Sequence, residues 1–488
     1  MADEEQGLPM TQKWDPAKLA REVAELQALE AKPFVPRLAG YLKRSGPGLL
    51  QSAMTLGAGS AVASVVAGAS FGYKLLWVQP VAMFLGIMMF AALGNVVLST
   101  GERPYKSFSR ELHVSIAFLW ALATIVASVI WHFPQYALAA AAARDLATLG
   151  GLIVDAPATD GTRNLTTSGY AVSFGVAFTI LAVNIFTTWN YGRGGRGIKI
   201  YEWFLRAVIA LVILSFATVV IRTGIDWGKL TSGFFGFWIP SDANGITLVL
   251  GAIGATVGIN MTFLYPYSLL AKGWGPHHKG LARCDLAVSM FTPFVLVTSL
   301  VIIAMANTVY APAAVEAVRD RLQPVDAARS LTAVFQSESL GRVIFDLGFI
   351  GMTCGAISAQ MVACGFTLCE MLGLRYSAWR YRLSTLLPCV GLLGAAFKTP
   401  MWLPIAASAV CLTLLPIAYI AFFAMNNKRS YLGDAVGYGW RRALFNAVLL
   451  VAIAVTTLGA AIKIKTGVVD KVFPATTPSA SPATVAPR

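Results

Sequence analysis

The sequence predicts an all-α integral membrane protein, and two observations carry that prediction. Hydrophobic residues make up 56% of the 488 residues and charged residues only 13%, about half the share that is usual in soluble domains. Apolar runs of about 20 residues, the length needed to cross about 30 Å of hydrocarbon, recur along the whole chain. Such runs form helices in a bilayer because a helix satisfies its own backbone hydrogen bonds.

Eleven spans are expected, all in one transmembrane domain. They run near residues 47–70, 77–100, 114–145, 170–190, 200–222, 244–272, 284–309, 338–372, 383–397, 402–425 and 441–464. The domain as a whole is predicted to occupy residues 46–466. An N-terminal segment, residues 1–45, carries a short amphipathic helix, and a Pro/Ser/Thr-rich tail, residues 467–488, is expected to be disordered.

The basic residues form short clusters between the apolar runs, as the positive-inside bias of membrane proteins requires. This pattern predicts a multi-pass protein of the cytoplasmic (inner) membrane with its N-terminus in the cytoplasm and, after eleven spans, its C-terminus outside. The net charge of +14 does not indicate nucleic-acid binding, because no basic face interleaved with aromatic residues is present. The expected partners are the lipid bilayer and a small transported solute or ion. The sequence does not indicate an oligomeric state.

Two of the expected spans contain clusters of glycine. The first span carries Gly57 and Gly59 in "TLGAGSAVAS", and the sixth carries Gly251, Gly254 and Gly258 in "GAIGATVGINMTF". A glycine inside a helix costs about 1 kcal/mol relative to alanine. Helices interrupted at matching positions of two halves are typical of the substrate site of secondary transporters. Close packing of helices through small residues is the alternative explanation.

Three stretches resemble helices of the NRAMP family of divalent-metal transporters. "GPGLLQSAMTLGAGSAVASVVAGASFGYKLLWV" is similar to the family's first helix, "GATVGINMTFLYPYSLL" to its sixth and "GAISAQMVACGFTLCEMLGLR" to its eighth. The resemblance covers residues 46 to about 465. It implies a LeuT-like fold, which has two inverted repeats of five helices and here one extra helix. It also implies a family that moves divalent metals together with protons.

The sequence departs from this family at the residues that bind the metal. The family's first-helix motif DPGN and sixth-helix motif MPH align with Gly57, Ala58, Gly59, Ser60, Gly258, Ile259 and Asn260. The aligned positions therefore lack the Asp and Asn ligands, the His, and the Met thioether that favours soft transition metals. The family's acidic positions on the third helix align with His132 and Gln135.

The predicted substrate site lies at the two glycine-rich breaks, which should be non-helical near residues 57–60 and 255–260 and face each other across a cavity. Its residues are Gly57, Ala58, Gly59, Ser60, Ala255, Gly258, Ile259 and Asn260. Three further side chains are expected to line the cavity or to take part in coupling, and these are His132, Gln135 and Gln360. Hydrogen bonds between helices are the alternative role for these three.

A site without carboxylates predicts a substrate other than a transition-metal ion, because a divalent cation needs oxygen ligands that replace its hydration shell. The site is expected to be neutral and roomier than that of the family, to carry a small polar or zwitterionic solute, and to have altered or absent proton coupling. Two alternatives stay open: a transporter of a largely hydrated divalent cation (Mg or Mn), and a membrane sensor or scaffold that does not transport. No cofactor, no resident metal and no enzymatic activity are expected.

Overall fold

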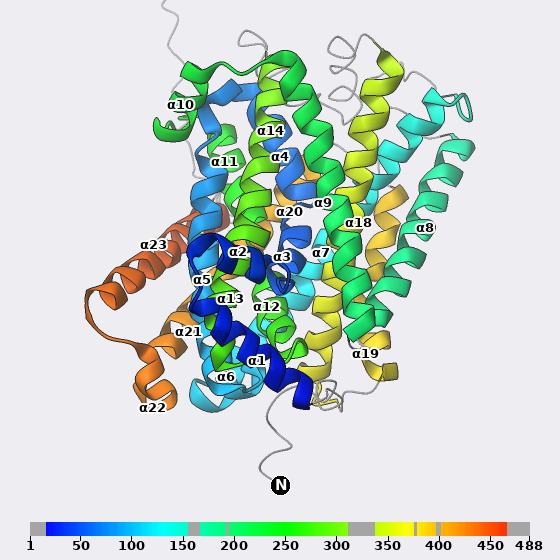
Figure 1. Cartoon of the computed structure of the whole chain (residues 1–488). Helices are drawn as coiled ribbons and strands as arrows, with labels where there is room; N and C mark the ends of the chain where they lie inside the picture. The colour runs from blue at the N-terminus through cyan, green and yellow to red at the C-terminus, as the bar shows by residue number, and fades with distance from the viewer. Residues whose placement is uncertain are drawn as a thin grey trace, which may run out of the picture.

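The structure, a computed structural model, describes residues 16–154, 166–191, 195–310, 337–374, 378–396 and 402–465. Every regular element among these residues is a helix (Figure 1). Within them nine helices are long and apolar enough to cross a membrane, or ten if a bent pair near the N-terminus forms one span. The all-α membrane class is therefore confirmed. The predicted tail at residues 467–488 lies outside the described residues, and the division into domains stays a prediction.

The first half of the chain contains the helices that precede the second glycine cluster. They are α1 (Pro16–Glu30), α2 (Phe34–Leu42), α3 (Pro47–Thr55), α4 (Ala58–Phe71), η1 (Gly72–Leu75), α5 (Val78–Thr100), α6 (Pro104–Glu111), α7 (Val114–Leu149), α8 (Thr167–Tyr191), α9 (Gly195–Thr223) and α10 (Trp227–Phe235).

The second half begins with the other glycine-rich span. Its elements are α11 (Ala243–Thr256), α12 (Ile259–Ala271), η2 (Pro276–His278), α13 (Lys279–Asp285), η3 (Leu286–Phe291), α14 (Thr292–Thr308), α18 (Glu338–Met371), α19 (Ala378–Thr385), η5 (Leu387–Ala396), α20 (Trp402–Leu412), α21 (Leu415–Asn427), α22 (Arg429–Leu432), η6 (Gly433–Val436) and α23 (Gly439–Ile464).

Two of the predicted spans differ in form from a continuous α-helix. The ninth consists of the end of α19 and of η5, a 3-10 helix of ten residues, which at a rise of about 2.0 Å per residue covers about 20 Å. The tenth is broken between α20 and α21, where Pro416 near the start of α21 cannot donate a backbone hydrogen bond. The count of eleven spans therefore stays a prediction.

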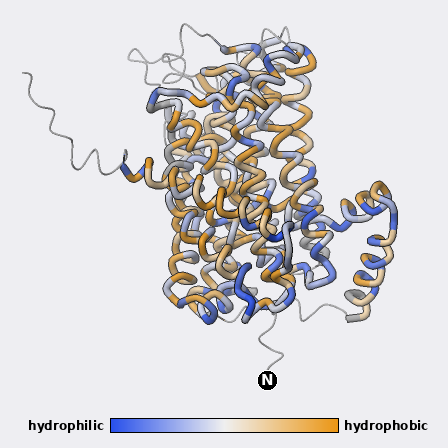
Figure 2. Tube along the Cα trace, turned by 90° about the vertical axis from the view of Figure 1, so that its left-hand side faces the viewer, coloured by the Kyte–Doolittle hydropathy of each residue, from blue (hydrophilic) through white to orange (hydrophobic). Residues whose placement is uncertain are grey.

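The glycine-rich helices lie inside the bundle, surrounded by the longer spans. α7 packs along α18 and along η5, while α4 packs against α14 and α11 against α20. Figure 2 shows hydrophobic residues over most of the length of the bundle and hydrophilic stretches mainly towards its lower and upper ends. Large apolar side chains on outer helices are exposed, among them Phe186 at 64% and Leu214 at 65%. Lipid contact explains this exposure, because soluble proteins rarely expose large apolar patches.

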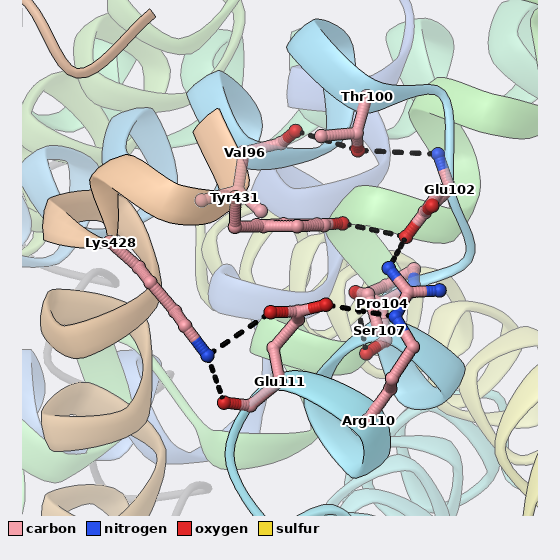
Figure 3. Close-up of polar contacts among 9 residues, drawn as sticks. All are labelled: Val96, Thr100, Glu102, Pro104, Ser107, Arg110, Glu111, Lys428 and Tyr431. Carbon is pink, nitrogen blue, oxygen red and sulfur yellow. Dashed lines mark hydrogen bonds and ion pairs between the residues drawn. The ribbon is translucent and has the colours of Figure 1, made fainter. Parts of the chain in front are cut away.

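A network of ion pairs ties together the end of the bundle that carries the N-terminus (Figure 3). Arg110 on α6 lies 2.8 Å from Glu102 and 2.8 Å from Glu111. Lys428 Nζ lies 3.0 Å from Glu111 Oε2, and the Tyr431 hydroxyl donates to Glu102 at 2.8 Å. Hydrogen bonds from Arg110, and then from Lys428, hold the pKa of the Glu111 carboxyl below its usual value. The network thus joins α6 to the segment between α21 and α22.

Candidate functional site

The first and sixth predicted spans are both broken, as the glycine clusters predict. The first break, residues 56–57, separates α3 from α4, and the chain bends by 52° there. The second break, residues 257–258, separates α11 from α12. Both breaks are confirmed, but they are shorter than the predicted stretches of residues 57–60 and 255–260. The remaining residues of those stretches lie in helical turns on either side.

The glycines of the first break provide space for neighbouring side chains. Gly57 has a φ of −111°, which any residue can adopt. A Cβ on Gly57 would lie 2.6 Å from Gln135 Nε2, and a Cβ on Gly59 would lie 2.2 Å from Trp131 Cη2. Trp131 and Gln135, both on α7, therefore occupy the volume that the glycines leave. The expectation of a site roomier than that of the family stays a prediction.

The alternative explanation, close packing of helices, holds for the other two glycines of the sixth span. A Cβ on Gly254 would lie 2.5 Å from the carbonyl oxygen of Ser408, and one on Gly251 would lie 3.0 Å from Ile405 Cγ2. Both neighbours belong to α20. These glycines let α11 approach α20 closely, which is the usual role of small residues between membrane helices.

A small cavity of about 20 Å³ lies between the two breaks and has room for about one water molecule. The predicted residues that line it are Gly57, Gly59, Ser60, Gln135, Ala255, Gly258, Asn260 and Gln360. The lining residues that were not among the predicted site residues are Met54, Thr55, Trp131, Gly254 and Met261. Ala58 and Ile259 are fully buried and are not among the lining residues.

Side chains replace the backbone hydrogen bonds that are lost where the helices stop. The Thr55 hydroxyl donates to the carbonyl oxygen of Thr256 at 3.0 Å and so links the two breaks directly. The Ser60 hydroxyl donates to the carbonyl oxygen of Thr55 at 2.5 Å. The Gln135 side-chain oxygen accepts from the first backbone N–H of α4, at Ala58, at 2.9 Å. Helix ends buried without water need such partners, and these bonds hold the breaks in place.

A thioether is present at the cavity. The sulfur of Met261 lies 3.3 Å from the backbone nitrogen of Gly258 and 3.4 Å from the Thr55 hydroxyl. Met261 is the third residue of α12, and helical side chains lean towards the N-terminus of their helix. Its sulfur therefore reaches back to the break. The thioether at this cavity therefore comes from a position outside the aligned motif.

Two amide side chains at the cavity have atoms without a hydrogen-bond partner. These atoms are Asn260 Nδ2 and Gln360 Oε1, on side chains that belong to residues only 1% and 2% exposed. The other end of the Asn260 amide is occupied, because its oxygen accepts from the backbone nitrogen of Met261 at 3.0 Å. Buried polar atoms are rarely left unpaired in proteins, so the cavity is suited to a polar ligand or an ion.

His132 lies behind the cavity, unlike Gln135 and Gln360. It is fully buried, and its Nδ1 donates to the carbonyl oxygen of Ser128 at 2.9 Å, one turn earlier on α7. Its other side packs against η5, where a Cβ on Gly391 would lie 2.2 Å from His132 Cβ. Two of the three accessory side chains therefore reach the cavity.

Carboxylates do not reach this cavity in the part of the chain that the structure describes. No aspartate or glutamate is among its lining residues, and no group of three His, Cys, Asp or Glu forms a metal cluster there. Two buried acids are paired away from the cavity: Glu202 lies 2.8 Å from Lys272, and Glu370 lies 3.2 Å from Arg103. The C-terminal ends of α3 and α11, which carry partial negative charge, meet at the cavity beside the N-terminal ends of α4 and α12, which carry partial positive charge.

Solved structures of membrane transporters share this architecture. A manganese transporter of Eremococcus coleocola, solved with an aromatic bis-isothiourea compound, matches with a TM-score of 0.68 at 14% identity, covering 90% of this chain and 89% of that one. Mhp1, a nucleobase-cation-symport-1 transporter, matches in a closed conformation with a TM-score of 0.53 at 14% identity, covering 88% and 94%. Both likenesses confirm the predicted LeuT-like fold.

Sequence relatives point to the same class of protein. A divalent metal cation transporter MntH of Granulibacter bethesdensis is 24% identical over 412 residues, which are 81% of this chain and 82% of the relative. The MntH of Klebsiella pneumoniae is 23% identical over 418 residues, covering 84% and 91%. These names contradict the expectation, drawn from the missing motif residues, of a substrate other than a metal ion.

The family comparison agrees with the paired breaks, the cavity between them and the matched structures. The family model described as natural resistance-associated macrophage protein-like matches residues 48–461, which include every element from α4 to α21. The resemblance of this chain to the family is therefore confirmed over most of its length. This chain belongs to the Nramp family of multi-pass membrane transporters.

Proposed function

We propose that this protein is a secondary transporter of divalent metal cations and binds its ion in the cavity between the two helix breaks. The observation that supports the proposal is the pair of possible ligand atoms at this cavity, the Met261 sulfur and the side-chain oxygen of Gln360. A thioether and an amide oxygen are neutral ligands, and a thioether favours softer transition metals. The relatives named as metal transporters support the same substrate class.

The size and chemistry of the cavity favour manganese over magnesium. A volume of about 20 Å³ leaves room for about one water molecule, so the ion would shed most of its hydration shell in this conformation. Magnesium loses water reluctantly, whereas a thioether is a ligand for softer transition metals. An ion that stays largely hydrated, the form considered from the sequence, does not fit this cavity.

Ion uptake into proteoliposomes tests the proposal. The purified chain is reconstituted, and the entry of Mn²⁺, Cd²⁺ and Mg²⁺ is followed with an enclosed metal-sensitive dye. We expect saturable uptake of Mn²⁺ and Cd²⁺ and little uptake of Mg²⁺. Vesicles that take up none of the three ions faster than protein-free vesicles would contradict the proposal and would leave the sensor or scaffold alternative.

A volume-conserving variant tests the site itself. Met261→Leu removes the sulfur with little change in packing, so we expect about tenfold slower Cd²⁺ uptake and a smaller loss for Mn²⁺. Met305→Leu is the matched control, because Met305 is equally buried and lies on α14 away from the cavity. Equal uptake by the two variants would place the ion site elsewhere.

We further propose that the protein acts in the cytoplasmic membrane with its N-terminus inside and its C-terminus outside, and that it is not an enzyme. Basic residues of α6, of α13 and of the start of α23 support this orientation through the positive-inside bias. Reporter fusions at the two ends test it. A reporter that is active only in the cytoplasm should function at the N-terminus, and one that is active only outside should function at the C-terminus.

A further inference from the structure

A second cavity, of about 520 Å³, opens between α5, α13 and the start of α23. Three arginines line it: Arg283, Arg441 and Arg442. Its apolar wall is formed by Ile87, Met88, Ala91, Leu286 and Phe445. We call this cavity the arginine pocket. Its lining contains no aspartate or glutamate, so the side chains that form it carry a net charge of three positive units.

The three guanidinium groups have no acidic partner within the described residues. The salt bridges among the described residues are formed by other basic side chains. Arg442 donates instead to neutral acceptors, the carbonyl oxygen of Asn426 at 2.5 Å and the side-chain oxygen of Asn427 at 2.7 Å. Its Nε has no hydrogen-bond partner. Like charges held in one pocket repel each other. Binding of an anion in the pocket would therefore compensate the three arginines.

The arginine pocket lies where a lipid headgroup would reach it. Arg441 and Arg442 begin the predicted eleventh span, now α23, while Arg283 lies near the start of the span that contains α14. Tyr438 and Trp440 flank the pocket with exposures of 61% and 71%, and aromatic side chains of this kind mark the boundary between lipid and water. Figure 1 shows α23 leaning outwards beside α5.

We propose that the arginine pocket binds the headgroup of an anionic phospholipid. The arginines supply charge-assisted hydrogen bonds to its phosphate, and the apolar wall lies beside its acyl chains. A free phosphate ion would use the arginines alone and would leave this apolar wall without a partner. Basic pockets between membrane helices are known to recognise anionic headgroups in this way. The lipid fills the space between α5, α13 and α23 and neutralises the three charges.

Native mass spectrometry of the detergent-purified full chain with added lipid tests this proposal. Phosphatidylglycerol is the anionic probe, and phosphatidylcholine is the matched neutral probe. We expect bound phosphatidylglycerol at concentrations where phosphatidylcholine leaves the protein unoccupied, and a higher melting temperature with the anionic lipid only. Equal binding of the two lipids would overturn the proposal.

The double variant Arg283→Gln/Arg441→Gln tests the position of the site. We expect its affinity for phosphatidylglycerol to fall about thirtyfold, since each arginine near an anionic headgroup contributes about 1 kcal/mol and 1.4 kcal/mol is tenfold. Arg382→Gln is the control, because Arg382 is half-buried on α19 and stacks on Trp189 away from the pocket. An unchanged affinity in the folded double variant, or the same loss in the control, would overturn the proposal.

Two further measurements distinguish a bound lipid from other occupants of the pocket. Inorganic phosphate and glycerol phosphate carry the same anion without acyl chains, so they should compete weakly with phosphatidylglycerol. Competition at similar concentrations would assign the pocket to a soluble anion. Light scattering gives the mass of the particle with and without lipid. A dimer that excludes phosphatidylglycerol would assign the pocket to an interface between two copies. Either result would overturn the lipid assignment.

Discussion

At the scale of single residues, the two breaks use glycine for different reasons. A Cβ on Gly59 would meet the ring of Trp131, which is held within α7, whereas a Cβ on Gly258 would meet only the Asn260 side-chain oxygen at 2.5 Å. The ring is part of the packed core, and the amide can rotate away. Glycine beside the first break thus avoids a clash with the packed core. Glycine at the second break leaves space for a ligand.

This difference predicts opposite outcomes for two matched substitutions. Gly59→Ala should lower the free energy of unfolding by about 1–3 kcal/mol, the usual cost of overpacking a core, and Trp131→Phe should restore part of the loss. Gly258→Ala should leave the melting temperature nearly unchanged but slow metal uptake, because the displaced Asn260 amide enters the small cavity. Thermal unfolding and liposome uptake of the variants measure both effects. Equal melting temperatures for the two glycine variants would contradict this interpretation.

At the scale of elements, the half-helix α3 is anchored by a carboxylate that sequence reasoning did not single out. Asp285, at the end of α13, is 1% exposed and accepts from the backbone nitrogen of Gly48 at 2.6 Å. Gly48 is the second residue of α3, where a negative charge complements the helix dipole. A Cβ on Gly48 would lie 2.6 Å from the Asp285 carbonyl oxygen, so glycine permits this close approach.

Asp285→Ala should therefore destabilise the protein and disturb transport together. The loss of a buried hydrogen bond to a charged group costs about 1.5–3 kcal/mol, and a loosened α3 should slow uptake because its C-terminal end forms the cavity. Asp226→Ala is the control, since Asp226 caps the short helix α10 through the backbone nitrogen of Lys229 at 3.0 Å and lies away from the cavity. Thermal unfolding and uptake of both variants provide the measurement. Full uptake in Asp285→Ala would contradict the anchoring role.

The long helices α7 and α18 are joined by a buried ion pair. Arg342 Nε lies 2.8 Å from Asp145 Oδ2, a second contact joins Arg342 Nη2 to Asp145 Oδ1, and each residue is only 5% exposed. Removal of one partner leaves an uncompensated charge away from water, whereas removal of both can be nearly neutral.

A double-mutant cycle tests this pair. Arg342→Met alone should cost about 3–5 kcal/mol, and the double variant with Asp145→Leu should cost clearly less. Asp346, fully buried one turn from Arg342, is kept unchanged in all variants. Denaturation of the single and double variants in detergent gives the coupling. Additive losses would show that the two side chains act independently.

At the scale of the whole molecule, the ion-pair network of Figure 3 connects α6 to the segment between α21 and α22. The pKa of Glu111 is lowered by Arg110 and Lys428. A lowered carboxyl pKa stabilises the folded state above the unfolded pKa of about 4.3, and this contribution is lost as the pH falls through the folded value. The contribution of Glu111 should therefore be constant between pH 7 and about pH 5.

Glu111→Gln tests that dependence. At pH 7 the variant should be less stable by about 1 kcal/mol or less, the usual range for partly exposed ion pairs. The difference in melting temperature from the parent should shrink below about pH 4, because protonation removes the charge from the parent as well. Glu22→Gln on α1 is the control, since no ion pair of Glu22 appears among the described residues. A difference that grows on acidification would contradict the assigned sign.

Most of the fold follows from the sequence, because every span must be an apolar helix long enough to cross the lipid bilayer. Apolar length sets where helices lie, and the predicted spans at 77–100 and 441–464 differ from α5 and α23 by two residues or fewer at each end. The two breaks were also predictable from glycine clusters at matching positions. The 3-10 form of the ninth span was not predictable from the sequence, since η5 takes this shape where Gly391 and Gly394 contact α7.

The sequence by itself determined the membrane class, the paired breaks and the resemblance to the family. The tertiary structure decided what occupies the space beside the breaks: the ring of Trp131, the amide of Gln135 and the sulfur of Met261. It also brought Arg283 to Arg441, more than 150 residues apart in the chain. Hydropathy fixes each helix along the membrane normal, but the rotation and spacing between helices depend on side-chain packing. Only the packed structure therefore shows which side chains meet.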